Sequence, residues 1–370
     1  MIDVLRWIKR GLDRLLFACF RQLFPVLPPA GRQAVVILRT DGIGDLVYFL
    51  PVLQKIRTRF RDSRLVLVCR SEAAPILPAS LADVLVPFGY LRYRWNYFYR
   101  LSILRRIRSY SPSLTLYCSY HRQHIGDEMA ICSGADRTIA FDGNDEIIHP
   151  AVRKRNNSFY SDLLPVEDHI PEKVRYDFLL RSLGITMGEG KEAFPATMPS
   201  DEFLGTFPWL GESKYVVVAP GGSAPIRRWP AKAFTLLGDQ LARRTGWRIV
   251  LCGGSEDREL VTAIASGMKS SPGLFLGEAL PAVARLISSA SLFVGNESGL
   301  LHIAASCGTP AVGILGGGHF SRYFPYRSVR IVNHALDCYE CNWSCPYPEP
   351  YCLTNITVED VMREVERSIG

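Results

Sequence analysis

The sequence predicts an α/β protein of two domains, each built on a parallel, doubly wound sheet. Its 370 residues exceed one typical domain and include enough apolar residues for two cores. In both halves, short apolar runs typical of buried parallel strands alternate with helical segments. We expect an N-terminal helix over residues 1–31, a first domain over 32–187, a linker over 188–213, a second domain over 214–355 and a C-terminal helix over 356–370.

The charge and the cysteine pattern restrict the class of partner and the compartment. A formal net charge of +7 favours an acidic partner such as an anionic membrane surface, a phosphorylated substrate or nucleic acid. The sequence has no zinc-finger motif, RNA-binding motif or long basic run, so we do not expect nucleic acid. Most of the ten cysteines stand singly in apolar segments, as buried thiols do in a reducing cytoplasm; examples are Cys69, Cys118, Cys252 and Cys307.

The first thirty residues have the pattern of a basic amphipathic helix. Apolar residues at helical spacing alternate with basic ones, namely Val4, Leu5, Ile8, Leu12, Leu15, Leu16, Phe20 and Leu23 with Arg6, Lys9, Arg10, Arg14 and Arg21. The longest apolar run, Leu15 to Phe20, is far shorter than the roughly 20 residues of a membrane span, and no signal-peptide cleavage site follows. The helix either lies on an anionic membrane or packs against the protein, and its basic flank favours the membrane.

The first β-α unit of the first domain carries a candidate catalytic carboxylate. An apolar strand from Ala34 to Leu38 leads through a glycine-containing loop into a helical pattern that reaches Phe60. Val47 stands where the third glycine of a dinucleotide fingerprint belongs, so that fingerprint is absent. Asp45 follows the carboxyl end of the strand, where open α/β sheets bind ligands. It either reaches a substrate or caps the helix.

The rest of the first domain adds strands and two basic clusters. Leu65 to Cys69, Val84 to Pro87 and Leu114 to Cys118 are further expected strands. Tyrosines and arginines are dense between Trp95 and Tyr120, and a second cluster comprises Arg153, Lys154 and Arg155. Such clusters suit sugars and phosphates, but a solvated helix face with core aromatics is the favoured interpretation of the first.

The second domain opens with a candidate phosphate-binding loop. An expected strand from Tyr215 to Ala219 precedes a Pro-Gly-Gly-Ser turn and two arginines, and a helix follows from Pro230 to Arg244. Backbone amides at Gly222 and Ser223 beside Arg227 would form a pyrophosphate cradle, unless the loop is a plain turn with surface arginines. After the next strand, Arg248 to Cys252, Glu256 and Asp257 either bind a ribose or cap a helix. Leu274 to Leu276, a helix from Ala279 to Ser289, Ser291 to Val294 and a last strand from Ala311 to Leu315 complete the domain.

The stretch from Gly295 to Pro310 has the pattern of a strand-turn-helix junction. A buried strand is expected to end at Gly295 and a helix to begin near Ser298. Unpaired amides and the helix dipole at such a start favour a phosphate, and Gly299 allows close approach. The alternative is that Glu297 and Ser298 only cap an ordinary helix.

Taken in order, these motifs resemble glycosyltransferase family 9, the lipopolysaccharide heptosyltransferases. The motifs are Gly44-Asp45 with Pro51, the Pro-Gly-Gly-Ser loop closed by Arg227-Arg228-Trp229-Pro230, Gly253-Gly254, Asn296-Glu297-Ser298-Gly299 with His302, and Gly308-Thr309-Pro310. The resemblance implies a GT-B fold, in which two Rossmann-like domains face each other across a cleft and the C-terminal one binds the donor nucleotide. It also implies an inverting reaction without a catalytic metal or other cofactor, in agreement with the absence of an Asp-x-Asp motif.

The resemblance assigns roles to several residues. It implies that Asp45 is the general base, and that the leaving diphosphate is stabilised by Gly222, Ser223, Arg227, Ser298 and Gly299. Arg227 stands where the family commonly has lysine, and Glu297 stands where it commonly has aspartate. The identity of the donor sugar is therefore predicted less firmly than the reaction. His302 either contacts phosphate or is a packed structural histidine.

The implied function is transfer of a sugar, expected to be heptose from ADP-heptose, onto the lipopolysaccharide core. The enzyme would act at the cytoplasmic face of the inner membrane, bound peripherally, with the nucleotide sugar, the core acceptor and the anionic membrane as partners. Alternatives are a family member with another nucleotide sugar, an epimerase of the same fold, and a noncatalytic nucleotide-sugar-binding protein.

A cysteine cluster and a final helix complete the sequence. Cys338, Cys341, Cys345 and Cys352 have a spacing that suits a structural zinc, although not that of a standard zinc ribbon, so free thiols or a disulfide remain alternatives. Similar clusters occur near the C-terminus of many family relatives. Thr357 to Ile369 is an expected helix, of the kind that in GT-B enzymes often crosses back to the first domain.

Overall fold

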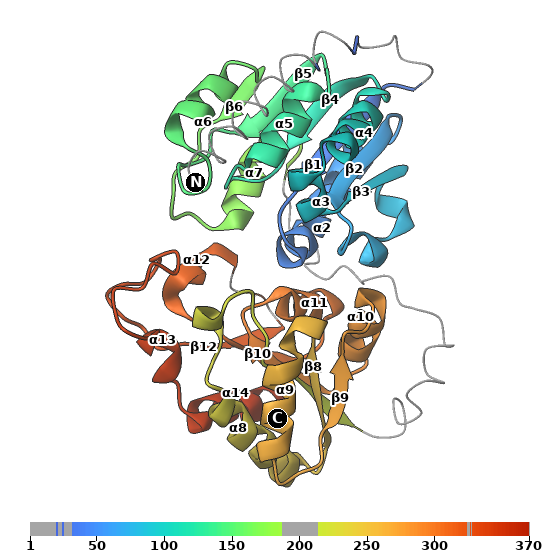
Figure 1. The fold of residues 1–370 in the computed structure, drawn as a ribbon. Helices are drawn as coiled ribbons and strands as arrows, with labels where there is room; N and C mark the ends of the chain where they lie inside the picture. Colours follow the sequence, from blue (N-terminus) through green and yellow to red (C-terminus); the bar gives the residue numbers. More distant parts are fainter. Residues whose placement is uncertain are drawn as a thin grey trace.

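The protein consists of two α/β domains, each with a six-stranded parallel sheet (Figure 1). The computed structural model describes residues 20, 24–25, 32–186, 214–323, 326 and 328–369. The expected linker over 188–213 lies outside the described residues, as does the expected N-terminal helix apart from Phe20, Phe24 and Pro25. Among the residues described, no helix is long and apolar enough to cross a membrane.

The first sheet has the strand order β3-β2-β1-β4-β5-β6, and its central strand is entirely buried. Its strands are β1 (Ala34–Arg39), β2 (Arg64–Arg70), β3 (Val84–Phe88), β4 (Pro112–Tyr117), β5 (Arg137–Phe141) and β6 (Asp162–Leu164). The helices are α2 (Ile43–Arg59), α3 (Tyr90–Trp95), α4 (Tyr97–Arg108), α5 (His124–Cys132), α6 (Pro150–Asn157) and α7 (Glu172–Ser182). The strand order reverses between β1 and β4, so their carboxyl ends flank the crevice where such sheets bind ligands.

The second sheet repeats this arrangement with the order β12-β11-β10-β7-β8-β9. Its strands are β7 (Tyr215–Ala219), β8 (Arg248–Gly253), β9 (Gly273–Leu276), β10 (Leu292–Asn296), β11 (Ala311–Ile314) and β12 (Val329–Val332). The helices are α8 (Ala231–Thr245), α9 (Arg258–Gly267), α10 (Leu280–Ser288), α11 (Gly299–Cys307), α12 (Phe320–Tyr323), α13 (Tyr351–Thr354) and α14 (Val358–Ile369). Here the order reverses between β7 and β10, whose carboxyl ends carry the Pro-Gly-Gly-Ser loop and Glu297.

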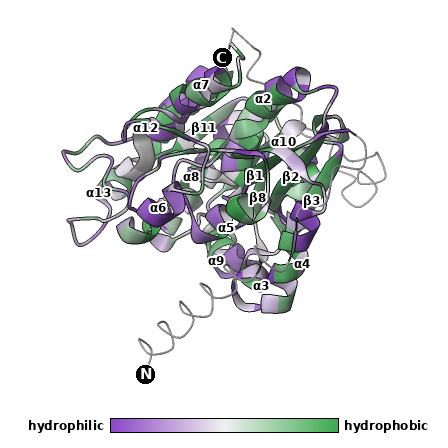
Figure 2. Cartoon of the chain, turned by 90° about the horizontal axis from the view of Figure 1, so that it is seen from above, coloured by the Kyte–Doolittle hydropathy of each residue, from purple (hydrophilic) through white to green (hydrophobic). Residues whose placement is uncertain are grey.

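Alternation along β1 divides the core of the first domain. Val35 and Ile37 pack with α2, whereas Val36 and Leu38 pack with Leu104 and the other apolar residues of α4 and α5. The cluster that contains α2 continues through α11 and α10 into the second domain, so one apolar core crosses the domain boundary. The hydropathy view agrees, with hydrophobic strands such as β1 and β8 inside and the hydrophilic α6 at the periphery (Figure 2).

Two expectations about the second domain are wrong. Ala311 to Leu315 is not the last strand, because β12 pairs in parallel with β11. This four-residue edge strand is only half-buried and is interrupted by Arg330, so it gives little periodic signal. The C-terminal helix is present, but α14 packs against α8, β11 and β12 of its own domain and does not cross back to the first. Its apolar face, including Val361 and Val365, is buried in the second domain's core.

The two phenylalanines at the end of the N-terminal segment pack against the first domain. Phe20 is buried in the core cluster of α4 and α5, and its ring lies 4.9 Å from that of Phe24. The Arg105 guanidinium stacks on Phe24 at 4.1 Å, and that of Arg108 lies 5.8 Å from Phe20. At this end, therefore, the chain is docked on α4.

Candidate functional site

The N-terminal ends of α2 and α11 meet across the domain boundary (Figure 1). A Cβ placed on Gly44 would lie 2.6 Å from Cδ2 of His302, and one on Gly299 would lie 3.3 Å from Cβ of Ile43. Only glycine fits at Gly44 without moving the histidine ring. The positive ends of two helix dipoles therefore face the same space.

A cavity of about 860 Å³ lies at this junction and receives residues from both domains. Its first-domain side is lined by Asp41, Gly42, Ile43, Gly44, Asp45, Arg70, His121, Gln123, Glu146 and Ile147. Its second-domain side includes Gly222, Ser223, Arg227, Glu256, Asp257, Glu297, Ser298, Gly299, His302, Arg322 and Tyr323. Arginines suit phosphate oxygens and carboxylates suit sugar hydroxyls, so this mixed lining fits a nucleotide sugar.

Asp45 has the capping role considered for it and also lines the cavity, where a substrate would lie. It is the third residue of α2, and its Oδ2 accepts a hydrogen bond from the Gly42 amide at 3.1 Å, which caps the helix. Its Oδ1 faces the second domain, where it accepts a hydrogen bond from the Tyr323 hydroxyl. Burial raises the pKa of Asp45, but Arg322, Arg39 and the Tyr323 hydrogen bond outweigh burial and lower that pKa to about 2. The carboxylate is therefore ionised at neutral pH.

Arg322 joins carboxylates of two different elements to the second domain. Its Nη2 lies 3.5 Å from Oδ1 of Asp45, and its Nε lies 3.6 Å from Oε2 of Glu172 on α7. Glu172 is itself buried and pairs with Arg175 at 3.0 Å. Arg322 and Tyr323 thus extend from the short helix α12 to the catalytic candidate in the first domain.

Asp41 is a second carboxylate at the carboxyl end of β1. Its Oδ2 accepts a hydrogen bond from Ser119 Oγ at 2.8 Å and forms an ion pair with Arg39 Nη2 at 3.0 Å. Its Oδ1 is buried and accepts no hydrogen bond from the described residues. Burial raises the pKa of Asp41 to about 6, and Arg39 limits the rise. A buried acceptor atom at the cavity is suited to a hydroxyl donor of a ligand.

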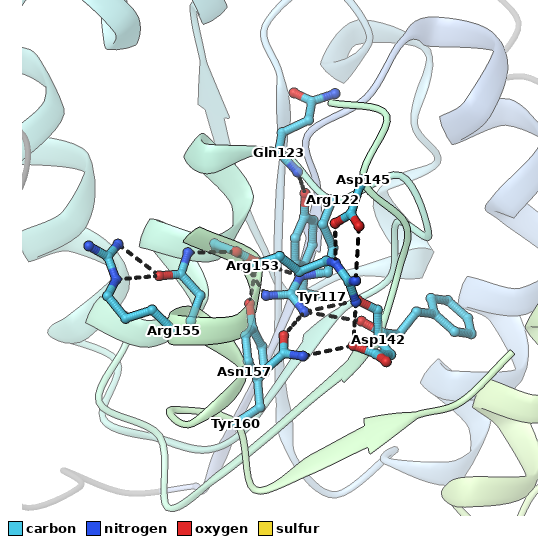
Figure 3. A network of polar contacts seen from close by, with 12 residues as sticks. Tyr117, Arg122, Gln123, Asp142, Asp145, Arg153, Arg155, Asn157 and Tyr160 are labelled. Atoms are coloured by element: carbon cyan, nitrogen blue, oxygen red, sulfur yellow. Dashed lines mark hydrogen bonds and ion pairs between the residues drawn. The ribbon is translucent and has the colours of Figure 1, made fainter. Parts of the chain in front are cut away.

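The loop between β4 and α5 is fixed by the side chain of its own residue Arg122 (Figure 3). The fully buried Arg122 guanidinium donates two hydrogen bonds of 2.8 Å to Asp127 and stacks on Tyr160 at 4.8 Å. His121 and Gln123 on either side of it line the cavity. Oε1 of Gln123 is buried and accepts no hydrogen bond from the described residues, so this loop presents a second acceptor atom to a ligand.

The Pro-Gly-Gly-Ser loop is tied to β10 and to its own arginines. The buried Asn296 amide donates to the carbonyl oxygens of Pro220 at 2.8 Å and Gly221 at 3.2 Å. The guanidinium of Arg228 donates to the Gly222 carbonyl at 2.9 and 3.1 Å. The loop is therefore preorganised.

The structure brings together the residues predicted to cradle the donor phosphates. Arg227 Nη1 donates to Ser223 Oγ at 2.9 Å, and its Nη2 lies 3.7 Å from Oε2 of Glu297. The guanidinium also stacks on the Trp343 ring at 5.1 Å. This arrangement holds the cation at the cavity next to Gly222.

Glu297 is the carboxylate with the most unusual environment in the cavity. Both of its oxygens are buried, and neither accepts a hydrogen bond within the usual geometric limits from the described residues. Burial raises the pKa of Glu297 to about 7, while Arg227 and Arg322 oppose the rise. A buried carboxyl in this state is a candidate acceptor for hydroxyls of a donor sugar.

The start of α11 has the geometry expected of an anion site. Ser298 occupies the N-cap position, but its side chain makes no capping hydrogen bond, so its hydroxyl is not used to cap the first turn. His302 is buried, and its Nδ1 lies 2.7 Å from the Tyr326 hydroxyl. Burial lowers the pKa of His302 to about 4, so the ring is neutral. Its contact with Gly44 and its ring packing on Tyr48 favour the structural interpretation.

Glu256 and Asp257 differ in their surroundings. Asp257 Oδ2 accepts from the Gly254 amide at 3.2 Å, and Oδ1 pairs with Arg228 Nη2 at 3.3 Å. Asp257 therefore has the capping role considered for it and also orients the loop arginine. Glu256 is exposed at the cavity, so it is the better candidate for a ribose.

The basic clusters lie elsewhere. The described residues that line the cavity include no residue between Trp95 and Tyr120 and none of Arg153, Lys154 and Arg155. Arg153 pairs with Asp142 and Asp145 at 2.8 Å each (Figure 3). On α4, Ile103, Leu104 and Ile107 are buried and Arg105 and Arg106 are exposed, as the favoured interpretation predicts, whereas Arg100 is buried and Phe98 is exposed.

The four C-terminal cysteines lie close to one another in the second domain. Burial and the neighbouring thiols of Cys341, Cys352 and Cys345 raise the pKa of Cys338. All four are free cysteines, and across the described part of the chain no group of three or more His, Cys, Asp or Glu side chains is arranged to hold a metal ion. The structural zinc stays a prediction.

Sequence reasoning missed part of the site. Arg322 and Tyr323 reach Asp45 only through the packing of the two domains, and no motif marks them. Glu172 and Arg70 likewise lack a local signal. Asp41 could have been found, because it directly follows an apolar strand at the edge where ligands bind.

Comparison with known proteins agrees with this architecture. Residues 173–345 match the family model described as glycosyltransferase family 9 (heptosyltransferase). The chain is 36% identical over 106 residues to lipopolysaccharide heptosyltransferase 3 of Escherichia coli (strain K12), an alignment that covers 28% of this chain and 30% of that protein. The sequence similarity to this relative therefore spans about a third of its length.

Solved structures extend the similarity to nearly the whole chain. A crystal structure of a family 9 glycosyl transferase from Veillonella parvula superimposes with a TM-score of 0.74 at 19% identity, covering 91% of this chain and 97% of that one. The E. coli heptosyltransferase WaaC with ADP-2-deoxy-2-fluoro heptose gives a TM-score of 0.66 at 17% identity, covering 90% and 99%. The predicted GT-B fold is thus confirmed.

Proposed function

Because residues 173–345 match the model of glycosyltransferase family 9, we propose that the chain is a member of this family and transfers a sugar from a nucleotide sugar to an acceptor hydroxyl. We expect the reaction to invert the anomeric centre and to need no metal ion or other cofactor. One observation carries the proposal: the ionised Asp45 of the first domain faces the Arg227 and Glu297 of the second across one cavity. Such a divided site can hold an acceptor and a donor on opposite walls.

The proposed donor is ADP-heptose, with its diphosphate against the second domain. Arg227, the Gly222–Ser223 loop and the first turn of α11 would neutralise the diphosphate without a metal. A relative of the same fold is described with ADP-2-deoxy-2-fluoro heptose, which supports a nucleotide sugar of this class. Glu297 has buried oxygens that suit sugar hydroxyls, and its extra methylene makes another donor sugar the main alternative.

In the proposed reaction Asp45 receives the proton of the acceptor hydroxyl. The acceptor oxygen bonds to the anomeric carbon, the bond from that carbon to the diphosphate oxygen breaks, and the nucleoside diphosphate leaves with the electron pair. A carboxylate whose pKa is about 2 is a weak base. Proton transfer is therefore late, after the attacking oxygen has bonded and become acidic. Arg322 and Tyr323 keep Asp45 ionised and oriented.

The proposed acceptor is the lipopolysaccharide core, at the cytoplasmic face of the inner membrane. Asp41 and Gln123 offer buried acceptor atoms on the first-domain wall, close to where a sugar hydroxyl would meet Asp45. The chain's net positive charge suits an acidic lipid-linked acceptor.

A donor and acceptor screen tests the proposal. Purified protein would be incubated with nucleotide sugars and truncated core acceptors, and products scored by mass; a gain of one heptose identifies the donor. Asp45→Asn should lower kcat by about 100- to 10,000-fold and keep donor affinity. Asp162→Asn, an exposed carboxylate on β6, is the matched control and should keep full activity. Donor binding without transfer to any acceptor would leave a noncatalytic binding protein as the function.

A further inference from the structure

The hairpin of α3 and α4 exposes an unusual group of large apolar side chains. Leu91, Trp95 and Phe98 are 68%, 63% and 88% exposed, and they lie close together in sequence where α3 ends and α4 begins. Contiguous exposed aromatic and aliphatic residues mark interaction sites on soluble proteins. Figure 2 shows α3 and α4 side by side at one edge of the molecule.

The same hairpin is strongly and uniformly basic. Between residues 89 and 108 the sequence contains no acidic residue and six arginines, namely Arg92, Arg94, Arg100, Arg105, Arg106 and Arg108. Four of these, Arg92, Arg94, Arg105 and Arg106, are exposed. Arginine beside exposed Trp, Phe and Leu is the composition that binds the interface of an anionic bilayer.

The hairpin that carries these exposed side chains is fixed by hydrogen bonds. The buried Glu128 of α5 accepts hydrogen bonds from the Tyr93 hydroxyl at 2.7 Å and from Arg100 Nε at 2.6 Å. The Asn96 side chain caps α4 through the Tyr99 amide at 2.9 Å. These hydrogen bonds fix the hairpin that carries the exposed aromatic residues, so docking would cost little conformational entropy.

Two contacts connect this hairpin to the rest of the molecule. Phe24 docks under Arg105, so the basic amphipathic N-terminal sequence enters the domain at α4. On the other side, Arg70 lines the cavity and stacks on Tyr90, the first residue of α3, at 4.4 Å. The hairpin therefore begins at the rim of the candidate active site.

We propose that the α3–α4 face docks on an anionic lipid bilayer. This face comprises Leu91, Trp95 and Phe98, which insert at the acyl boundary, and Arg92, Arg94 and Arg105, which bind headgroup phosphates. The docking goes beyond the proposed sugar transfer and does not depend on it. If both hold, the hairpin places the cavity rim next to the membrane that carries a lipid-linked acceptor.

Cosedimentation of the full chain with sucrose-loaded vesicles tests the docking, with no donor or acceptor present. Wild type should bind vesicles of phosphatidylcholine with phosphatidylglycerol, bind phosphatidylcholine alone at least about tenfold more weakly, and lose binding in high salt. Trp95→Ser with Phe98→Ser, and Arg92→Gln with Arg94→Gln, should each lower the partition coefficient about tenfold. The matched control, Leu236→Ser with Arg243→Gln on α8 of the second domain, should bind like wild type.

Three outcomes would overturn the proposal. The first is a wild-type protein that does not bind anionic vesicles. The second is a pair of docking variants that bind as tightly as wild type, since the N-terminal sequence would then account for all of the binding. A dimer in solution that Trp95→Ser with Phe98→Ser dissociates, without vesicle binding, would make the face a self-interface. Because binding is measured without turnover, none of these results bears on sugar transfer. Circular dichroism should be unchanged, because the substituted side chains are exposed.

Discussion

Nη2 of Arg322 lies 3.5 Å from Oδ1 of Asp45, although 277 positions separate the two residues in the sequence. A cation of the second domain thus helps to set the pKa of the candidate base in the first domain. Arg39 of the first domain adds to this effect, so the pKa of Asp45 depends on contacts from both domains. The contact between the two domains therefore helps to set the pH at which Asp45 titrates.

Removing this cation should raise the pKa of Asp45. A carboxyl whose pKa is lowered in the folded protein stays ionised down to low pH, so the loss of Arg322 moves its titration upward. For Arg322→Gln we expect the acidic limb of the kcat–pH profile to move up by about one pH unit or more, whereas Arg322→Lys should shift it less. Arg330→Gln, which removes an exposed cation paired with the half-buried Glu364, is the control. Superimposable profiles for wild type and Arg322→Gln would contradict the link.

Gly44→Ala should separate the two domains. The new methyl group would lie 2.6 Å from Cδ2 of His302, so either the ring or the domain must move. We expect kcat/KM to fall on the order of tenfold or more, and His302→Ala in the same chain to restore part of it. Gly89→Ala, whose Cβ would meet nothing closer than 3.6 Å, should keep wild-type activity. An unaffected Gly44→Ala enzyme would show that the contact is not needed for turnover.

Glu297 should make stability depend on pH. Burial raises its pKa from 4.5 to about 7, so the folded state holds the proton more tightly than the unfolded state. Its contribution is fully present below pH 4.5 and is lost as the pH rises through about 7. Between about pH 5 and 8 the Tm of wild type should therefore fall further than that of Glu297→Gln, measured by calorimetry without ligand. If the Tm of both proteins changed with pH in the same way, the raised pKa of Glu297 would be contradicted.

Arg122→Ala should be strongly destabilising, since it leaves Asp127 buried without its cation. We expect a loss of about 3 to 5 kcal/mol in the free energy of unfolding from urea titrations. The control is Arg137→Ala, which breaks the exposed pair with Asp162 and should cost about 0 to 1 kcal/mol. Similar losses for both variants would mean that the buried network adds nothing beyond a surface pair.

Much of the fold follows from local sequence, because buried parallel strands are short apolar runs that recur between helices. β7, Tyr215–Ala219, is present with the predicted bounds, and α11 begins at Gly299 after Ser298, as expected. The edge strand β12 lacks an apolar run, so it was missed. Whether α14 crossed to the first domain depended on its tertiary contacts.

The candidate site likewise contains residues that local sequence predicts and residues that only the packing of the two domains brings in. Asp45 and the Gly222–Arg227 loop lie at strand ends that local patterns locate, and they do line one cavity. Arg322 and Tyr323 follow a glycine run without periodicity, and their approach to Asp45 depends on how two domains pack. A contact of this kind leaves no trace in a single sequence.

The starts of α2 and α11 face each other, and the cavity between them contains carboxylates that balance their positive ends. Two positive dipole ends point into one space, and Asp45 and Glu297 supply the negative charge there. A nucleoside diphosphate bound there would add negative charge beside these carboxylates. Glu297, whose pKa is about 7, could then take up a proton. Ligand capture would then behave as a proton-coupled exchange, and calorimetry in buffers of different ionisation enthalpy would report the proton.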